Sequence, residues 1–419
     1  MRPLLALLLT ALLALAAEAQ GPKPGTVNFR GKNYEAAALP AEAGGAAKSA
    51  VLFWAPWAKS KGYRLDLDPS RRVLLLTARA NVDAPLGLVL RTEALFDGLF
   101  PAPVLAAGPE TGSGGAPVAA GKPAGAGGNS GAGRGGDPED PEVIPEDPEA
   151  PPPLAPKTAP PGRDDAALEA ASRRVESVFR ADSETAALLI AKNTEDYASA
   201  LAHLAAAHPY LAEWKAKAVG QIGFALGTPL CGAYNENSPG QEEWSPDNEL
   251  VHRTMALLVL RRFSSQPYWL QTALAWHAEM AIQKSIYCMP YRDGFVGIGE
   301  HGGWIQELSS LYGKREKEPL RLEEFLMKRG VWNDKASKTA LGMVDYMART
   351  NSRALAAMME ELRRFAEQDN RVTNADGTWM RNPEYEVPPA QQQALLERYF
   401  GERLLRTVIA HWAGAAPPK

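Results

Sequence analysis

The sequence has few cysteines: only two, Cys231 and Cys288, among its 419 residues. So few cysteines exclude the disulfide-dense frameworks that hold small secreted domains together. A pairing cannot be deduced from sequence alone. A disulfide between Cys231 and Cys288 and two buried thiols therefore both stay open, with the thiols preferred.

An excess of positive charge is also missing, because the formal net charge is −4. Seven acidic residues and no basic residue lie within 137–149, so the rest of the chain is close to neutral. No basic stripe marks a surface for nucleic acid or for an anionic membrane. We therefore expect no nucleic-acid partner.

Long apolar runs are absent after the first residues of the chain. An apolar run at 4–16 follows Arg2 and precedes an A-x-A cleavage pattern at 17–19. This layout is typical of a secretory signal peptide, and the run is shorter than the roughly 20 residues needed to span a bilayer. We expect residues 1–19 to be removed from an exported protein, periplasmic or secreted, that keeps no membrane span.

Residues 101–165 lack large apolar side chains. Gly, Ala, Pro and Ser dominate 106–136, and acidic, proline-rich sequence follows. Such a segment cannot bury enough apolar surface to offset the entropy of ordering, which predicts a disordered linker. The linker divides the mature chain into a small α+β domain at 20–100 and a larger, mostly helical domain at 166–415.

The apolar patterns predict a fold class of α+β, mostly helical, with a small sheet in each domain. The alternation at 63–67 and the apolar run at 73–77 predict a hairpin, which a helix follows. The larger domain begins with a buried strand at 187–191 and a helix capped by Thr194. Two short strands are expected at 223–227 and 230–234. Later helical segments are 247–263, 268–287, 320–329, 336–349, 352–367 and 389–413.

The chemically informative stretch is NELVH at 248–252, followed by WLQTALA at 269–275. In a zinc peptidase, H-E-x-x-H places two histidines on one helix face, and the glutamate acts as general base on the zinc-bound water. The chain resembles the gluzincins and the bacterial peptidase-MA-like domains. In these families the third ligand is a glutamate within W-L-x-E-G-x-A, about twenty residues after the second histidine.

This resemblance covers about 180–415 and implies a thermolysin-like (zincin) domain. Glu249 matches the general base, and His252 matches the second histidine ligand. Asn248 stands in place of the first histidine, and Thr272 in place of the glutamate ligand. By this alignment, two of the three zinc ligands are replaced.

The replacements predict a loss of zinc-dependent hydrolysis. An amide oxygen is a poor zinc ligand beside imidazole or thiolate, and one histidine cannot hold zinc in a three-ligand catalytic site. We therefore expect no cofactor and a pseudo-metallopeptidase that binds a peptide or protein in the ancestral substrate cleft. The strands at 223–234 would offer an edge for β-strand addition.

An active zinc metallopeptidase with a shifted ligand set is the main alternative. His252, His277 and His301 would supply its ligands. Glu279 lies on the same helix face as Thr272, but seven residues correspond to roughly 10 Å, which predicts that it is too far away to replace Thr272.

Two other interpretations involve no chemistry. In the first, the chain is a structural cell-envelope protein that uses the peptidase-like frame as a scaffold. In the second, Glu249 and His252 form a solvent-facing pair on an ordinary helix. The aromatic residues nearby are predicted to be core rather than the wall of a peptide groove. They are Tyr268, Trp269, Trp276, Tyr287, Tyr291 and Trp304.

Overall fold

The computed structural model describes residues 24–101, 184–237, 245–287, 326, 334–369, 371–373, 379–381 and 386–412. The expected signal peptide at 1–19 lies outside these residues, as does the expected linker at 101–165 beyond its first residue. Within the described part of the chain, no helix has the length and apolar character needed to cross a bilayer.

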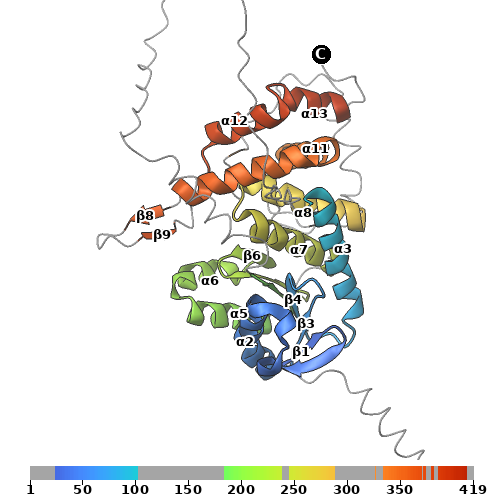
Figure 1. Cartoon of the computed structure of the whole chain (residues 1–419), viewed down its shortest axis with the longest axis vertical. Helices are drawn as coiled ribbons and strands as arrows, with labels where there is room; N and C mark the ends of the chain where they lie inside the picture. The colour runs from blue at the N-terminus through green and yellow to red at the C-terminus, as the bar shows by residue number, and fades with distance from the viewer. Residues whose placement is uncertain are drawn as a thin grey trace, which may run out of the picture. The chain divides into compact units, whose positions relative to one another are not determined.

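One seven-stranded mixed sheet is central to the fold, with the strand order β2-β1-β3-β4-β5-β7-β6 (Figure 1). Its strands are β1 (Thr26–Phe29), β2 (Lys32–Glu35), β3 (Arg64–Leu67), β4 (Val73–Thr77), β5 (Ala186–Ala191), β6 (Gly223–Gly227) and β7 (Leu230–Asn235). The expected hairpin of β3 and β4 is present and antiparallel. β4, β5 and β7 run parallel to one another, and β6 is an antiparallel edge strand.

The expectation of two domains, each with its own small sheet, is corrected by this topology. β4 comes from 20–100 and β5 from 166–415, and the two strands pair from Val73↔Ala186 to Thr77↔Ile190. All five residues of β4 are buried. A strand that is apolar on both faces needs helices on both sides and neighbours at both edges. The described residues before and after the expected linker therefore form one folded unit.

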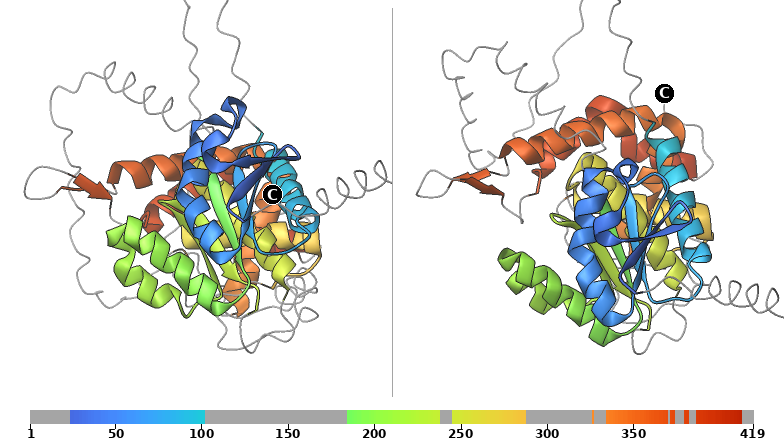
Figure 2. Two further views of the ribbon diagram at one scale, coloured as in Figure 1. Left: turned by 90° about the horizontal axis from the view of Figure 1, so that it is seen from below. Right: turned by 60° about the horizontal axis from the view of Figure 1, so that its bottom comes forward.

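Helices cover both faces of the sheet (Figure 2). One layer contains α2 (Gly44–Lys61), α5 (Thr194–Ala207) and α6 (Ala212–Ala218), and the other contains α3 (Asp83–Leu99), α7 (Pro246–Phe263) and α8 (Tyr268–Gln283). Leu74 and Leu76 belong to the core beneath α2 and α5, whereas Val73 and Leu75 belong to the core beneath α3, α7 and α8. The period-two alternation of β4 thus serves two cores.

The C-terminal helices are α11 (Asp334–Asp369), α12 (Pro389–Phe400) and α13 (Leu404–Trp412), with a small hairpin of β8 (Arg371–Thr373) and β9 (Trp379–Arg381) between α11 and α12. Of these helices, α11 packs against α8, and α12 and α13 pack mainly against α11. Trp269 Nε1 donates to Gln392 Oε1 at 2.9 Å, which ties α8 to α12. Trp269, Trp276 and Tyr287 are buried, which confirms their assignment to the core. Tyr291 and Trp304 lie outside the described residues.

The start of α5 differs by one residue from the expectation. Asn193, not Thr194, is the N-cap, and its side-chain oxygen accepts the Asp196 N–H at 2.8 Å. Both residue types are good caps. The Thr194 hydroxyl is used elsewhere, because it accepts the Asn235 Nδ2–H at 3.0 Å and so links α5 to the end of β7.

A buried carboxyl group joins the β3–β4 turn to α3. Asp68 accepts the backbone N–H groups of Ser70 and Val73, at 2.8 and 2.7 Å. The Ser70 hydroxyl lies 3.1 Å from Glu93 Oε1. Burial and then the nearby charge of Asp68 raise the pKa of Glu93 to about 8. Glu93 therefore carries a proton near neutral pH.

This proton predicts a pH dependence of stability. The folded state holds it more tightly than the unfolded chain, in which the pKa is near 4.5. The stabilisation is complete below that value and is lost as the pH rises through about 8. Glu93→Gln should reduce the change in the free energy of unfolding between pH 4.5 and about 8. The variant should also be more stable than the wild type in alkaline solution. Urea unfolding at several pH values measures the free energy of unfolding of both proteins. If it changes with pH in the variant as it does in the wild type, Glu93 is not the group that holds the proton.

Candidate functional site

Helix α7 carries the candidate motif, and its N-terminus sets the direction of each side chain. Ser245 caps the helix by accepting the Asn248 N–H at 3.3 Å, and Pro246 occupies the first helical position. Asn248, Glu249 and His252 are 2%, 2% and 8% exposed. The interpretation of Glu249 and His252 as a solvent-facing pair is therefore wrong.

The carboxylate of Glu279, on α8, is the centre of a buried polar cluster. Its Oε1 lies 2.7 Å from His252 Nδ1. Its Oε2 accepts from Asn248 Nδ2 and from the Tyr287 backbone N–H, both at 2.8 Å. Asn248 Nδ2 also donates to the Ser285 carbonyl at 2.9 Å. Glu279 is fully buried, so donors from α7 and from the chain after α8 satisfy this carboxylate together.

The prediction that Thr272 faces the motif, with Glu279 too far away, is wrong. His252 lies eleven residues before Phe263, the end of α7, and Glu279 lies eleven residues after Tyr268, the start of α8. Two antiparallel helices joined by a short turn bring together residues at equal distances from that turn. Thr272 is only four residues into α8, and its hydroxyl interacts with that of Tyr268.

Glu249, at the general-base position, faces the sheet rather than α8. It follows Asn248 by one residue, which turns it by about 100° around the helix. Its Oε2 accepts from Arg253 Nε at 2.9 Å, one turn along α7. Burial, with the charge of Glu249 as a smaller contribution, raises the pKa of Tyr234 on β7. The Glu249 carboxylate is thus neutralised by an arginine on its own helix.

The shifted ligand set is not brought together. His277 precedes Glu279 by two residues, about 200° around α8, and its Nδ1 lies 3.0 Å from Asp345 Oδ1 on α11. Burial acts to raise the pKa of Asp345, but hydrogen bonds from His277 and Arg349 outweigh it and lower that pKa. His252 and His277 thus bind different carboxylates.

His301, the third member of that set, lies outside the described residues. Within the ranges that the structure describes, no group of three or more His, Cys, Asp or Glu side chains is arranged to hold a metal ion. Cys231 is a buried free thiol, and Cys288 is outside the described ranges.

The donor set of the cluster does not fit a three-ligand zinc centre. Asn248 Nδ2 faces two acceptors, Glu279 Oε2 and the Ser285 carbonyl. A flipped amide would place its oxygen against both, so the hydrogen-bond network determines the orientation. An amide N–H has no lone pair to offer a metal. Among the described residues of the cluster, His252 and Glu279 are then the zinc ligands of the usual kind, and the amide nitrogen lies against the carboxylate.

The chain matches no protein-family model and no curated protein. Its function is therefore inferred from the geometry of α7, α8 and the adjoining strands.

Proposed function

We propose that this chain is an exported, peptidase-like protein that binds an extended peptide and does not hydrolyse it. The observation that supports the absence of hydrolysis is the hydrogen bonding of Glu279. Its two oxygens accept from Asn248, from His252 and from the Tyr287 backbone. In a gluzincin-like centre the corresponding carboxylate would bind zinc, whereas here the neutral asparagine amide donates a hydrogen bond to it.

The burial and ion pairing of Glu249 also support the absence of hydrolysis. A general base must reach the water or hydroxyl whose proton it takes. Glu249 has a 3% exposed side chain and is held by Arg253. Glu249 is therefore one half of a structural ion pair within α7, and the proposed function assigns it no proton transfer.

The peptide-binding half of the proposal depends on β6. Among the described strands it is the last in the sheet, with β7 as its one neighbour. It lies directly on α7, because a Cβ at Gly223 would be 3.1 Å from Arg253 Nε and one at Gly227 would be 3.3 Å from Leu260 Cδ2. Glycine at both ends lets the strand approach the helix that carries the motif.

The hydrogen-bond pattern shows which groups of β6 would receive a peptide. Asn235 N–H donates to the Ile222 carbonyl at 2.9 Å, so these two residues form a hydrogen-bonded pair. The register continues with Phe224↔Ala233 and Ala225↔Gly232. Because hydrogen-bonded and non-hydrogen-bonded pairs alternate, the N–H and C=O of Ala225 point away from β7. An added strand would pair there, as in β-augmentation.

Ala225→Pro should therefore weaken peptide binding, by roughly tenfold or more, because proline removes the outward N–H. An edge strand tolerates proline where its N–H faces outward. Ala225→Gly is the matched control, since it also changes the side chain but keeps the N–H. Titration with a set of unfolded peptides measures the affinities, and amide exchange of 223–227 reports where each peptide binds.

The same titration separates binding from a purely structural role. If the chain is a cell-envelope scaffold, no peptide will bind near α7 and β6, and both variants will behave like the wild type. Equal binding by Ala225→Pro and Ala225→Gly would also remove β-strand addition from the proposal.

A further inference from the structure

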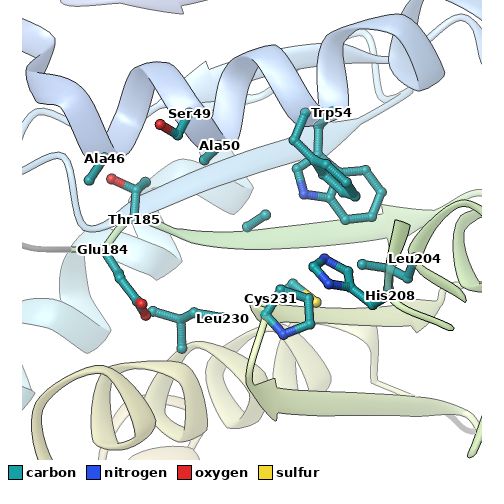
Figure 3. Close-up of a pocket in the computed structure, with 13 residues that line it drawn as sticks. Ala46, Ser49, Ala50, Trp54, Glu184, Thr185, Leu204, His208, Leu230 and Cys231 are labelled. Carbon is teal, nitrogen blue, oxygen red and sulfur yellow. The ribbon is translucent and has the colours of Figure 1, made fainter. Parts of the chain in front are cut away.

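A pocket of about 380 Å³ opens on the opposite face of the sheet, between α2, β5 and β7 (Figure 3). Its walls are mainly apolar, with Ala50 on α2, Leu204 on α5 and Leu230 on β7. The volume lies within the range of small-molecule sites, about 300–1,000 Å³. This pocket belongs to the α2 and α5 side and shares no lining residue with the Glu279 cluster.

Trp54 supplies a polar group aimed into the pocket. Its side chain lines the pocket, and the residue is only 4% exposed. Figure 3 shows the indole nitrogen turned toward the middle of the space. Among the described residues, no acceptor is within hydrogen-bonding distance of this N–H. By contrast, Trp57, one turn along α2, donates to Ser199 Oγ at 3.2 Å.

A buried indole N–H normally has a hydrogen-bond partner. Trp54 Nε1 is not closed off from the pocket, so an acceptor placed there can accept a hydrogen bond from it. His208 adds a half-buried ring beside the same space. Trp54 and His208 thus place the polar recognition groups at one end of an apolar pocket.

The other groups in the pocket limit the class of ligand. Burial raises the pKa of the Cys231 thiol well above its usual range. Cys231 is thus a protonated, apolar wall, and covalent chemistry is disfavoured. The Glu184 carboxylate at the exposed mouth repels anions, and apolar walls disfavour any charge taken deep inside.

We propose that this pocket binds a small, uncharged, mostly apolar molecule whose hydrogen-bond acceptor faces Trp54 Nε1. An aromatic amide has this chemistry, because its carbonyl oxygen accepts while its ring lies against the alanine and leucine side chains. The proposal does not depend on the function assigned to α7 and β6.

Fluorine NMR with para-fluorobenzamide and para-fluorobenzylamine tests it on the full chain. The amide should bind and the cationic amine should not. Trp54→Phe keeps a ring but loses the N–H, and should weaken amide binding about fivefold, the equivalent of one hydrogen bond. Trp57→Phe, whose N–H is used internally, should bind like the wild type.

Ala50→Leu provides a second test, because it fills the pocket from the surface of α2 and should abolish amide binding. Circular dichroism checks that each variant is folded. The proposal is overturned if the amide does not bind the wild type, if the amine binds as well as the amide, or if Trp54→Phe and Ala50→Leu bind like the wild type.

Discussion

Asn248→His is expected to create a zinc site that holds about one ion per chain. The new imidazole would lie one turn before His252 on the same face of α7, both opposite Glu279. Two histidines and one carboxylate form the ligand set of a catalytic zinc site. The substitution also removes the amide N–H that now binds the carboxylate. Elemental analysis after dialysis against a chelator and then against zinc measures the bound metal.

Two further variants make this prediction specific to Glu279. Adding Glu279→Gln to Asn248→His should abolish the zinc, because the double variant has lost its carboxylate ligand. Adding Thr272→Glu to Asn248→His should change nothing, since Thr272 lies near the α7–α8 turn beside Tyr268. Zinc binding that requires Thr272→Glu and ignores Glu279 would restore the alignment based on sequence and contradict the structural assignment.

Glu279→Ala should be the most destabilising single substitution in the cluster, by about 3–5 kcal/mol. Glu279 is 0% exposed and accepts from His252, Asn248 and the Tyr287 backbone. Alanine would leave these donors buried without their acceptor and would open a cavity between α7 and α8. Urea unfolding followed by circular dichroism measures the loss.

Glu195→Ala is a suitable control for that experiment, because Glu195 also lies on a helix and pairs with Lys61, but its side chain is 85% exposed. An exposed ion pair contributes about 0–1 kcal/mol, so the control should unfold almost like the wild type. Similar losses for Glu279→Ala and Glu195→Ala would mean that the cluster contributes nothing beyond a surface pair.

The elements that were predictable from sequence are those with strong local patterns. The β3–β4 hairpin and the strands at 223–227 and 230–235 follow from apolar alternation and turn residues. Helix α2 does not follow from the sequence, because Pro56 lies inside it and an interior proline predicts a helix end. Buried Trp54 and Trp57 on both sides of Pro56 hold the helix against the sheet, so tertiary packing overrides the local preference.

The errors in long-range organisation had a different cause. The composition of 101–165 predicted two domains, but composition along the chain does not reveal that β4 and β5 are neighbours. The third position of the cluster was misassigned for a related reason. A motif spacing of twenty residues assumes that the first helix ends soon after the second histidine, whereas α7 continues to Phe263. Measuring positions from the turn at 264–267 would have identified Glu279.

If hydrogen bonds hold the Glu279 cluster in place of a metal, peptide binding at β6 needs no ion and leaves the peptide intact. The most direct measurement is the mass of a bound peptide recovered from the wild-type chain after incubation with either zinc or a chelator. We predict equal amounts of uncut peptide in both samples. Fragments that form with zinc, or binding that disappears with the chelator, would show that a metal ion acts in this cluster.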